Sequence, residues 1–141
     1  MNKPAYDVEY LESMKRKTRY LFKLIARNCE DVFGTIEKYM RSTYRKYMDM
    51  GNPLYLNKTP KQILGSMNIK VDLHAEISEK YDEFRLEWMA DIYTYLQWNF
   101  GLWSADIVGK ILPEDLYRKY NPLHETSLKN GAWKLKEIYG L

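Results

Sequence analysis

The spacing of apolar residues predicts two long helical elements in this chain of 141 residues. Over residues 7–50 apolar positions recur every three or four residues, which is the spacing of one helical face. They are Phe22, Ile25, Cys29, Val32, Ile36, Tyr39, Thr43 and Tyr47. A straight helix over this range would be about 65 Å long. We therefore expect either a break near Asn28–Asp31, with Asn28 capping a second helix, or a protruding hairpin arm.

A second apolar series predicts a helix over residues 72–99 that Gly101 ends. Its members are Leu73, Ile77, Tyr81, Phe84, Trp88, Ile92 and Tyr95. Gly51-Asn52-Pro53 ends the first helical element. Residues 51–58 are predicted to form a loop between the two elements. Thr59 and Gln62 have the spacing of a capping box, with Pro60 at the first helical position.

Shorter helices are predicted in the last third of the chain. Ser104 is the expected cap of a helix that ends near Lys110, and Pro113 opens another that Asn121-Pro122 ends. Ser127 is the expected cap of the last helix. No alternating pattern typical of strands persists. We predict an all-α, single-domain bundle over residues 1–141, with a long helical element at 7–50, a loop at 51–58 and a helical remainder at 59–141.

Composition narrows the class of protein. With 45% hydrophobic residues the chain can bury a core, and its 15% aromatic content argues against disorder. One cysteine, Cys29, allows no internal disulfide, and the first ten residues lack the apolar run of a signal peptide. We therefore expect a cytoplasmic protein with no membrane partner. The spacing of Cys29, His74 and His124 matches no zinc site, and we expect no metal or cofactor.

Cations gather in the first third of the chain. Residues 1–50 hold eleven Lys and Arg against seven Asp and Glu, although the net charge of the whole chain is only +3. One predicted stripe consists of Lys15, Arg19, Lys23 and Arg27, and a second group beside tyrosines includes Arg41 and Arg45. Such residues contact nucleic-acid phosphates. The alternatives are a solvated face, an acidic protein partner, or packing against an acidic helix of the same chain.

An acidic run is the complement of that stripe. Its members are Asp72, Glu76, Glu79, Asp82, Glu83, Glu87 and Asp91. Like charges at helical spacing repel by a few tenths of a kcal/mol per pair, so cations should lie opposite them. The run is expected either to pack beside the basic stripe or to bind a basic partner.

Aromatic residues are dense near the end of the second long element. Trp88, Tyr95, Trp98 and Trp103 lie close in the sequence and cannot all share one helical face. Tryptophan and tyrosine are enriched at the centres of protein interfaces. We take these four as the candidate partner-binding residues, for another protein or for a second copy of this chain, with a tyrosine-rich core as the alternative.

The segment Leu116 to Glu125 carries the one motif that suggests catalysis. Arg118 and His124 are separated by five residues. This resembles the Arg-x4–6-His signature of HEPN domains, which are helical bundles that often cleave RNA as dimers. The resemblance implies that Arg118 and His124 would act on the scissile phosphate. The match covers only these few residues, and Pro122 lies inside it.

A fainter likeness covers Trp88 to Trp98, Ser104, Tyr120 and His124. This arrangement is similar to small helical proteins encoded beside toxin genes or mobile elements in low-GC bacteria, and it implies a role in neutralising a partner. We therefore expect a non-enzymatic protein-binding module of antitoxin, immunity or mobile-element accessory type. The alternative is a nucleic-acid-binding protein or a HEPN-like ribonuclease.

Overall fold

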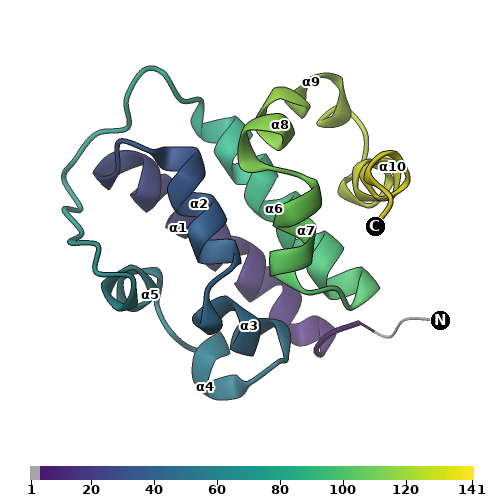
Figure 1. The fold of residues 1–141 in the computed structure, drawn as a ribbon, viewed down its shortest axis with the longest axis horizontal. Helices are drawn as coiled ribbons and strands as arrows, with labels where there is room; N and C mark the ends of the chain where they lie inside the picture. The colour runs from purple at the N-terminus through teal and green to yellow at the C-terminus, as the bar shows by residue number, and fades with distance from the viewer. Residues whose placement is uncertain (1–3) are drawn as a thin grey trace.

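The computed structural model describes residues 4–141 and shows an all-α protein (Figure 1). Within these residues a short 3₁₀-helix, η1, precedes ten α-helices, and there is no strand. The bounds are η1 Val8–Tyr10, α1 Leu11–Asn28, α2 Val32–Met40, α3 Thr43–Asp49, α4 Pro53–Leu56, α5 Pro60–Ser66, α6 Glu83–Phe100, α7 Ser104–Lys110, α8 Pro113–Arg118, α9 Tyr120–Leu123 and α10 Leu128–Tyr139.

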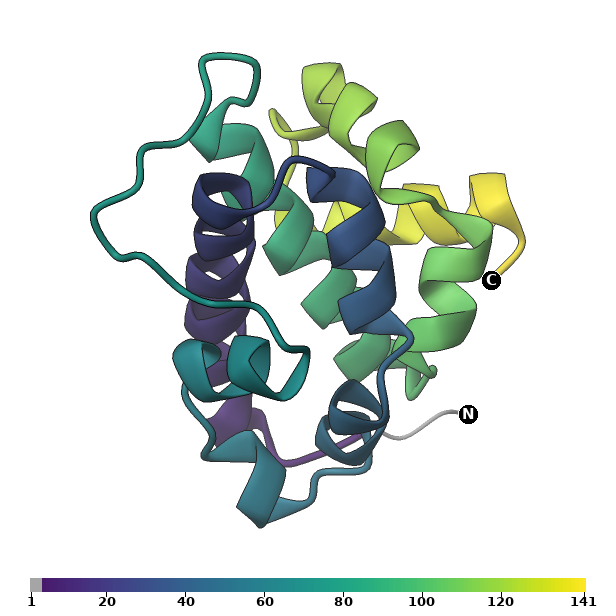
Figure 2. The same ribbon diagram turned by 60° about the vertical axis from the view of Figure 1, so that its left-hand side comes forward.

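The two longest helices, α1 and α6, lie side by side in the middle of the molecule (Figure 1, Figure 2). Phe22 of α1 meets Tyr93 of α6 edge-on, with ring centroids 6.3 Å apart. Helices α7, α8 and α10 also pack on α6, so this helix is buried on most of its circumference. Each large apolar side chain that is fully buried in this way contributes about 1.5–3 kcal/mol to the free energy of folding. The α1–α6 pair is therefore the scaffold that positions the shorter helices.

The first long element is divided into several helices. The expected break near residues 28–31 is confirmed, because α1 ends at Asn28 and α2 begins at Val32. The cap is Asp31, however, whose side chain accepts a hydrogen bond from the Gly34 N–H at 2.9 Å. Asn28 instead accepts the N–H of Asp72 from a distant segment, at 2.8 Å. A further break before α3 and the packing of α2 on other helices exclude a protruding arm.

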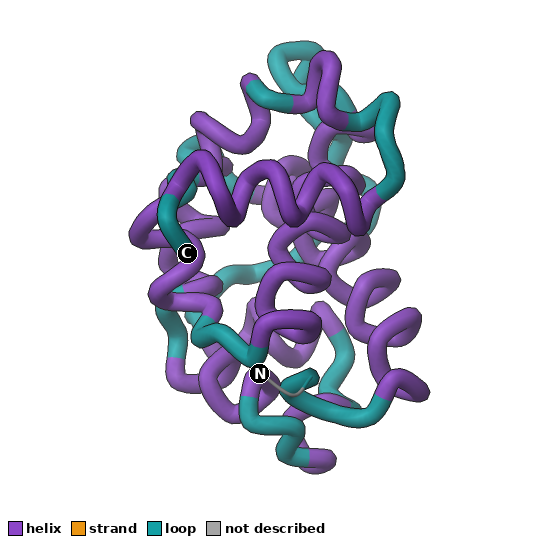
Figure 3. Tube along the Cα trace, turned by 90° about the vertical axis from the view of Figure 1, so that its right-hand side faces the viewer, coloured by secondary structure: helices purple, strands orange, loops and turns teal. Residues whose placement is uncertain are grey.

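The second long element begins later than predicted. Helix α6 starts at Glu83, so the expected helix over residues 72–99 is wrong in its first part. Residues 67–82 form an irregular connection along the outside of the molecule, visible as the long teal loop in Figure 1 and Figure 2. Figure 3 separates helix from loop along the described residues and shows no strand among them. Ile69 and Ile77 pack against the core from this irregular backbone, while Glu76 and Glu79 stay exposed. A helix here would have placed like charges on one face.

Several local signals act as predicted. Thr59 and Gln62 form the capping box before α5, Ser127 caps α10, and Pro113 opens α8. Gly101 ends α6 in the left-handed region, with φ of 61°. Two further predictions were wrong. The loop at 51–58 contains α4, and Ser104 does not cap α7, because it is the first residue of that helix.

Candidate functional site

Three cations of the predicted basic stripe are held in ion pairs with acids of this chain. The pairs are Lys15 with Glu12 at 2.7 Å, Arg19 with Asp91 at 2.6 Å, and Lys23 with Glu87 at 3.5 Å. The last two pairs join α1 to α6, which is the predicted packing of the stripe beside acids of the second long element. Arg27 is half-buried. Most of the stripe's charge is thus balanced within the molecule.

The second predicted group of cations divides between surface and core. Arg41 is exposed, and its Nε donates to Glu37 Oε2 at 3.0 Å. Arg45 is fully buried, with 0% of its surface exposed. The expectation that Arg45 binds nucleic acid is therefore wrong. Helix α3 turns Arg45 inward together with Met48 and Asp49, and its guanidinium has no access to a phosphate.

Arg45 is the centre of a buried polar network that sequence reasoning missed. Its Nε donates to Asp49 Oδ1 at 3.1 Å and to Ser104 Oγ at 2.9 Å. Its Nη1 donates to the Tyr39 hydroxyl at 3.0 Å and to Thr18 Oγ1 at 3.4 Å. These partners lie on four helices, α1, α2, α3 and α7. The network therefore fixes how the start of α7 meets the end of α3.

Asp49 is the carboxylate that balances this buried charge. Ser104 donates its backbone N–H to Asp49 Oδ2 and its hydroxyl to Asp49 Oδ1, both at 2.7 Å. Burial raises the pKa of the Asp49 carboxyl, and the Arg45 guanidinium opposes that rise. Buried charges are tolerated where paired and hydrogen-bonded in this manner. The i, i+4 spacing of Arg45 and Asp49 was visible in the sequence. No nearby residue indicated that Ser104 would hydrogen-bond to both of them.

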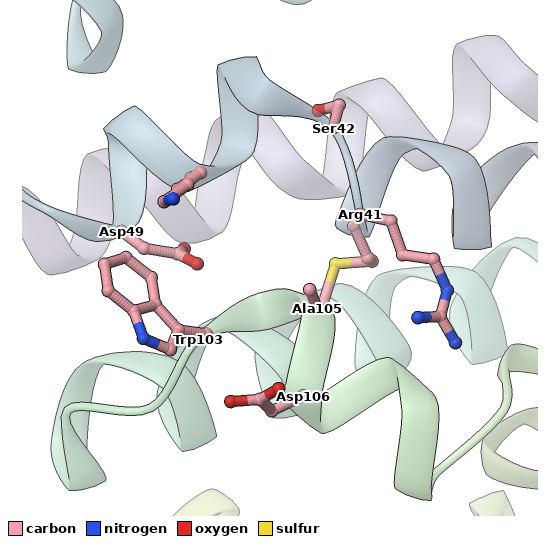
Figure 4. A pocket seen from close by; sticks show the side chains of 8 residues that line it. Arg41, Ser42, Asp49, Trp103, Ala105 and Asp106 are labelled. Carbon is pink, nitrogen blue, oxygen red and sulfur yellow. The ribbon is translucent and has the colours of Figure 1, made fainter.

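A hollow of about 260 Å³ lies over this network, between the α2–α3 corner and α7 (Figure 4). Its lining is Met40, Arg41, Ser42, Lys46, Asp49, Trp103, Ala105 and Asp106. Trp103 lies beside Asp49 at one end and Arg41 lies at the other (Figure 4). The Lys46 ammonium stands 5.6 Å from the Trp103 ring centroid, within range of a cation–π contact. The hollow combines an aromatic wall, exposed cations and a hydrogen-bonded floor.

A second hollow continues along the other side of α7. It has a volume of about 450 Å³ and is lined by Arg41, Leu102, Ala105, Asp106, Gly109, Lys110 and Leu141. The two hollows share Arg41, Ala105 and Asp106. We call the joined feature the α7 groove. A Cβ on Gly109 would lie 3.5 Å from Arg41 Nη2, so the arginine lies close over the helix backbone at that position.

The four predicted partner-binding aromatics have different surroundings. Trp103 is 44% exposed and forms a wall of the α7 groove. Trp98 is half-buried, and its Nε1 donates to the Tyr6 carbonyl at 2.8 Å. Tyr95 packs against Trp98, with ring centroids 5.9 Å apart, and Trp88 packs against Tyr120. Only Trp103 of these four combines wide exposure with a place in the α7 groove.

The structure does not bring Arg118 and His124 to one hollow. Arg118 is exposed and paired with Glu114 at 2.8 Å. The His124 ring is stacked on Tyr120, with centroids 3.9 Å apart, and its Nδ1 lies 2.7 Å from the Tyr120 carbonyl oxygen. His124 lines a separate open hollow with Arg19, Trp88 and Asp91, and Arg118 is not part of that lining.

The described residues show neither a cluster of metal ligands nor a membrane-spanning helix. In residues 4–141 no three His, Cys, Asp or Glu side chains are grouped closely enough to hold a metal ion. Among the described helices, none has the length and apolar character needed to cross a membrane. Comparison with family models, curated proteins and solved structures finds no match to this chain. Geometry and charge are therefore the basis for inferring what this protein binds.

Proposed function

We propose that this protein is a non-enzymatic cytoplasmic binding module that neutralises or regulates a protein partner, and that it contacts this partner through the α7 groove. The observation that carries the proposal is the position of Trp103. Its indole is 44% exposed and stands over a hollow whose floor is held by the Arg45–Asp49 network. Tryptophan and arginine are the residues most enriched at interface hot spots, and Trp103 shares the hollow with Arg41.

The hollow beside Trp103 is small and continues into the rest of the groove. Its volume of about 260 Å³ lies below the range of about 300–1,000 Å³ typical of ligand pockets, and it joins the second hollow of about 450 Å³ along α7. A preorganised floor lowers the entropic cost of binding, because few groups must be ordered when a partner arrives. The hollow therefore suits one or two side chains of a partner that lie against the indole of Trp103.

Charge defines the partner further. Arg41, Lys46 and Lys110 are exposed along the α7 groove, whereas Asp106 is its one exposed acid within the described lining. Complementary charge raises the rate of association and selects orientation. We expect a partner segment in which an apolar side chain is flanked by carboxylates.

The chain offers a matched pair of tryptophans for the test. Trp103 and Trp133 are both 44% exposed, but Trp133 lies on α10 and packs against Phe100. Tagged wild-type protein, Trp103→Ala and Trp133→Ala are used to capture proteins from host lysate after nuclease treatment, and the bound proteins are measured by mass spectrometry. The wild type and Trp133→Ala should retain one stoichiometric protein that Trp103→Ala loses.

Equal loss in both tryptophan variants, or no stoichiometric protein at near-physiological salt, would contradict the proposal. Retention of the partner by Trp103→Ala would place the interface elsewhere. Circular dichroism of each variant shows whether the fold is intact before binding is compared.

A further inference from the structure

A second surface, formed by α3, α4 and α5, is poor in acids. No Asp or Glu occurs from Met50 to Val71, a range that covers α4, α5 and the turns beside them. In α3 the one acid is Asp49, which is buried against Arg45. These helices lie together at one end of the molecule, next to α1 (Figure 2).

Three tyrosines cluster on this surface. The rings of Tyr47 and Tyr55 are nearly parallel, with an interplanar angle of 22° and centroids 4.7 Å apart. Tyr44 meets Tyr55 edge-on at 5.0 Å. Tyr47 is 36% exposed, so the stacked pair presents an aromatic ring to solvent. A flat ring at the end of a stack can extend that stack with one more planar group.

Lysines follow this cluster directly. The backbone N–H of Lys58 bonds to the Tyr55 carbonyl at 3.1 Å, and Lys61 is exposed in the first turn of α5. Neither lysine has an ion pair with an acid of the described chain, unlike Arg19 and Lys23 of the predicted stripe. We call Tyr44, Tyr47, Tyr55, Lys58 and Lys61 the tyrosine–lysine face.

The tyrosine–lysine face adjoins two other parts of the molecule. Gly51, which follows α3, lies against Tyr6, with an added Cβ 3.1 Å from the Tyr6 Cβ. On α3 the Lys46 ammonium stands against Trp103 of the α7 groove. None of the five residues of the face lines the α7 groove, so the two surfaces are separate.

We propose that the tyrosine–lysine face binds single-stranded nucleic acid. Unpaired lysines supply the charge that phosphates require, and an exposed tyrosine at the end of a stack supplies the surface on which a base stacks. An acidic peptide would use the lysines but not the stacked rings.

The test uses a fluorescein-labelled oligothymidylate of about 15 nucleotides, near the upper site size of a single binding fold. Fluorescence anisotropy measures affinity between about 50 and 200 mM salt, where phosphate contacts dominate the salt dependence. Lys58→Gln/Lys61→Gln should reduce the slope of log affinity against log salt by about 1.4, since each phosphate contact contributes about 0.7 for single strands. The matched control, Lys129→Gln/Lys134→Gln, removes two exposed lysines from α10 and should leave the slope unchanged.

Stacking is tested separately from charge. Tyr47→Ala should weaken binding roughly five-fold or more, whereas Tyr47→Phe keeps the ring and should bind as the wild type does. If Tyr47→Ala does not fold, the variant of Lys58 and Lys61 still decides the question. Trp103→Ala should leave oligonucleotide binding unchanged, so a failure of the α7 groove proposal is distinguishable from a failure of this one.

Three results would overturn the proposal. They are no oligonucleotide binding at about 50 mM salt, an equal loss of slope in the two lysine pairs, or equal affinity of Tyr47→Ala and the wild type. Binding to phosphatidylserine vesicles or to polyglutamate, without binding to the oligonucleotide, would assign the face to another class of partner.

Discussion

Two arginine–aspartate pairs in this molecule have similar chemistry and different surroundings. Arg19 and Asp91 join α1 to α6 at 2.6 Å, and their side chains remain 31% and 20% exposed. Arg45 and Asp49 pair within α3 at 3.1 Å, with 0% and 2% exposed. Water and salt reach the first pair, which is bidentate because Arg19 Nη2 also donates to Asp91 Oδ2 at 3.0 Å, and they weaken it relative to a fully buried pair. The second pair is removed from water, so each buried charge needs the opposite charge of its partner to be stable.

The two pairs show that charge has two roles in this small fold. At the α1–α6 interface, charge balances charge on the surface and leaves little for a partner. At the α3–α7 junction, buried charge fixes the geometry beneath Trp103. Cations outside both pairs include Lys46 and Lys110 on the α7 groove and Lys58 and Lys61 on the tyrosine–lysine face.

The largest expected effect comes from breaking the buried pair. Asp49→Ala leaves the Arg45 guanidinium buried without its carboxylate, which should lower the free energy of unfolding by about 3–5 kcal/mol. Urea unfolding followed by circular dichroism measures this loss. Arg45→Met/Asp49→Leu removes both charges and should recover part of it. If the double variant is no more stable than Asp49→Ala, the lost hydrogen bonds to Ser104 and Tyr39 matter more than the unpaired charge.

An intermediate effect is expected at Tyr6, which lies near the buried pair. Burial raises the pKa of Tyr6 well above the ordinary value of 10.0. Above pH 10 the unfolded chain loses this proton while the native chain keeps it, so the native state is favoured less as pH rises. Each further pH unit should remove about 1.4 kcal/mol of stability.

Tyr6→Phe tests this pH dependence. Among residues 4–141 the Tyr6 hydroxyl has no hydrogen-bond partner, so the variant should be about as stable as the wild type at neutral pH. Above pH 10 its stability should fall less steeply in urea unfolding. Tyr20→Phe, which alters an exposed ring, is the control. Equal alkaline slopes for Tyr6→Phe and the wild type would contradict the assignment.

The smallest expected effect comes from the half-buried pair of Arg19 and Asp91. Asp91→Asn should change the free energy of unfolding by about 0–1 kcal/mol, and the change should shrink as salt is raised. Thermal or urea unfolding at low and high salt measures it. A loss as large as that of Asp49→Ala would show that exposure is not what separates the two pairs.

Local features of the sequence predicted much of the helical framework. The capping box at Thr59 and Gln62, the cap at Ser127 and the end of α6 at Gly101 are confirmed. Each depends on a side chain or a φ angle within a few residues of the helix end. The all-α class follows from the same short-range periodicity, which no strand pattern interrupts.

Tertiary packing decided what periodicity could not. Leu73 and Ile77 continued the helical spacing of α6, yet the chain from 67 to 82 is irregular and contacts the core through a few side chains. Phe84 also matched the predicted apolar face but is 71% exposed, because α6 is packed by several helices and its buried side differs from that face.

The candidate site likewise has one part that the sequence predicted and another that only the folded structure shows. Trp103 was a predicted binding residue, and its type and position were readable from the sequence alone. The inward turn of Arg45, the role of Ser104 and the α7 groove required segments far apart in the chain to meet. Helix caps and periodicity are short-range and lie within one stretch of sequence. Burial and charge pairing depend on which distant helices share a surface, and only the folded chain determines that.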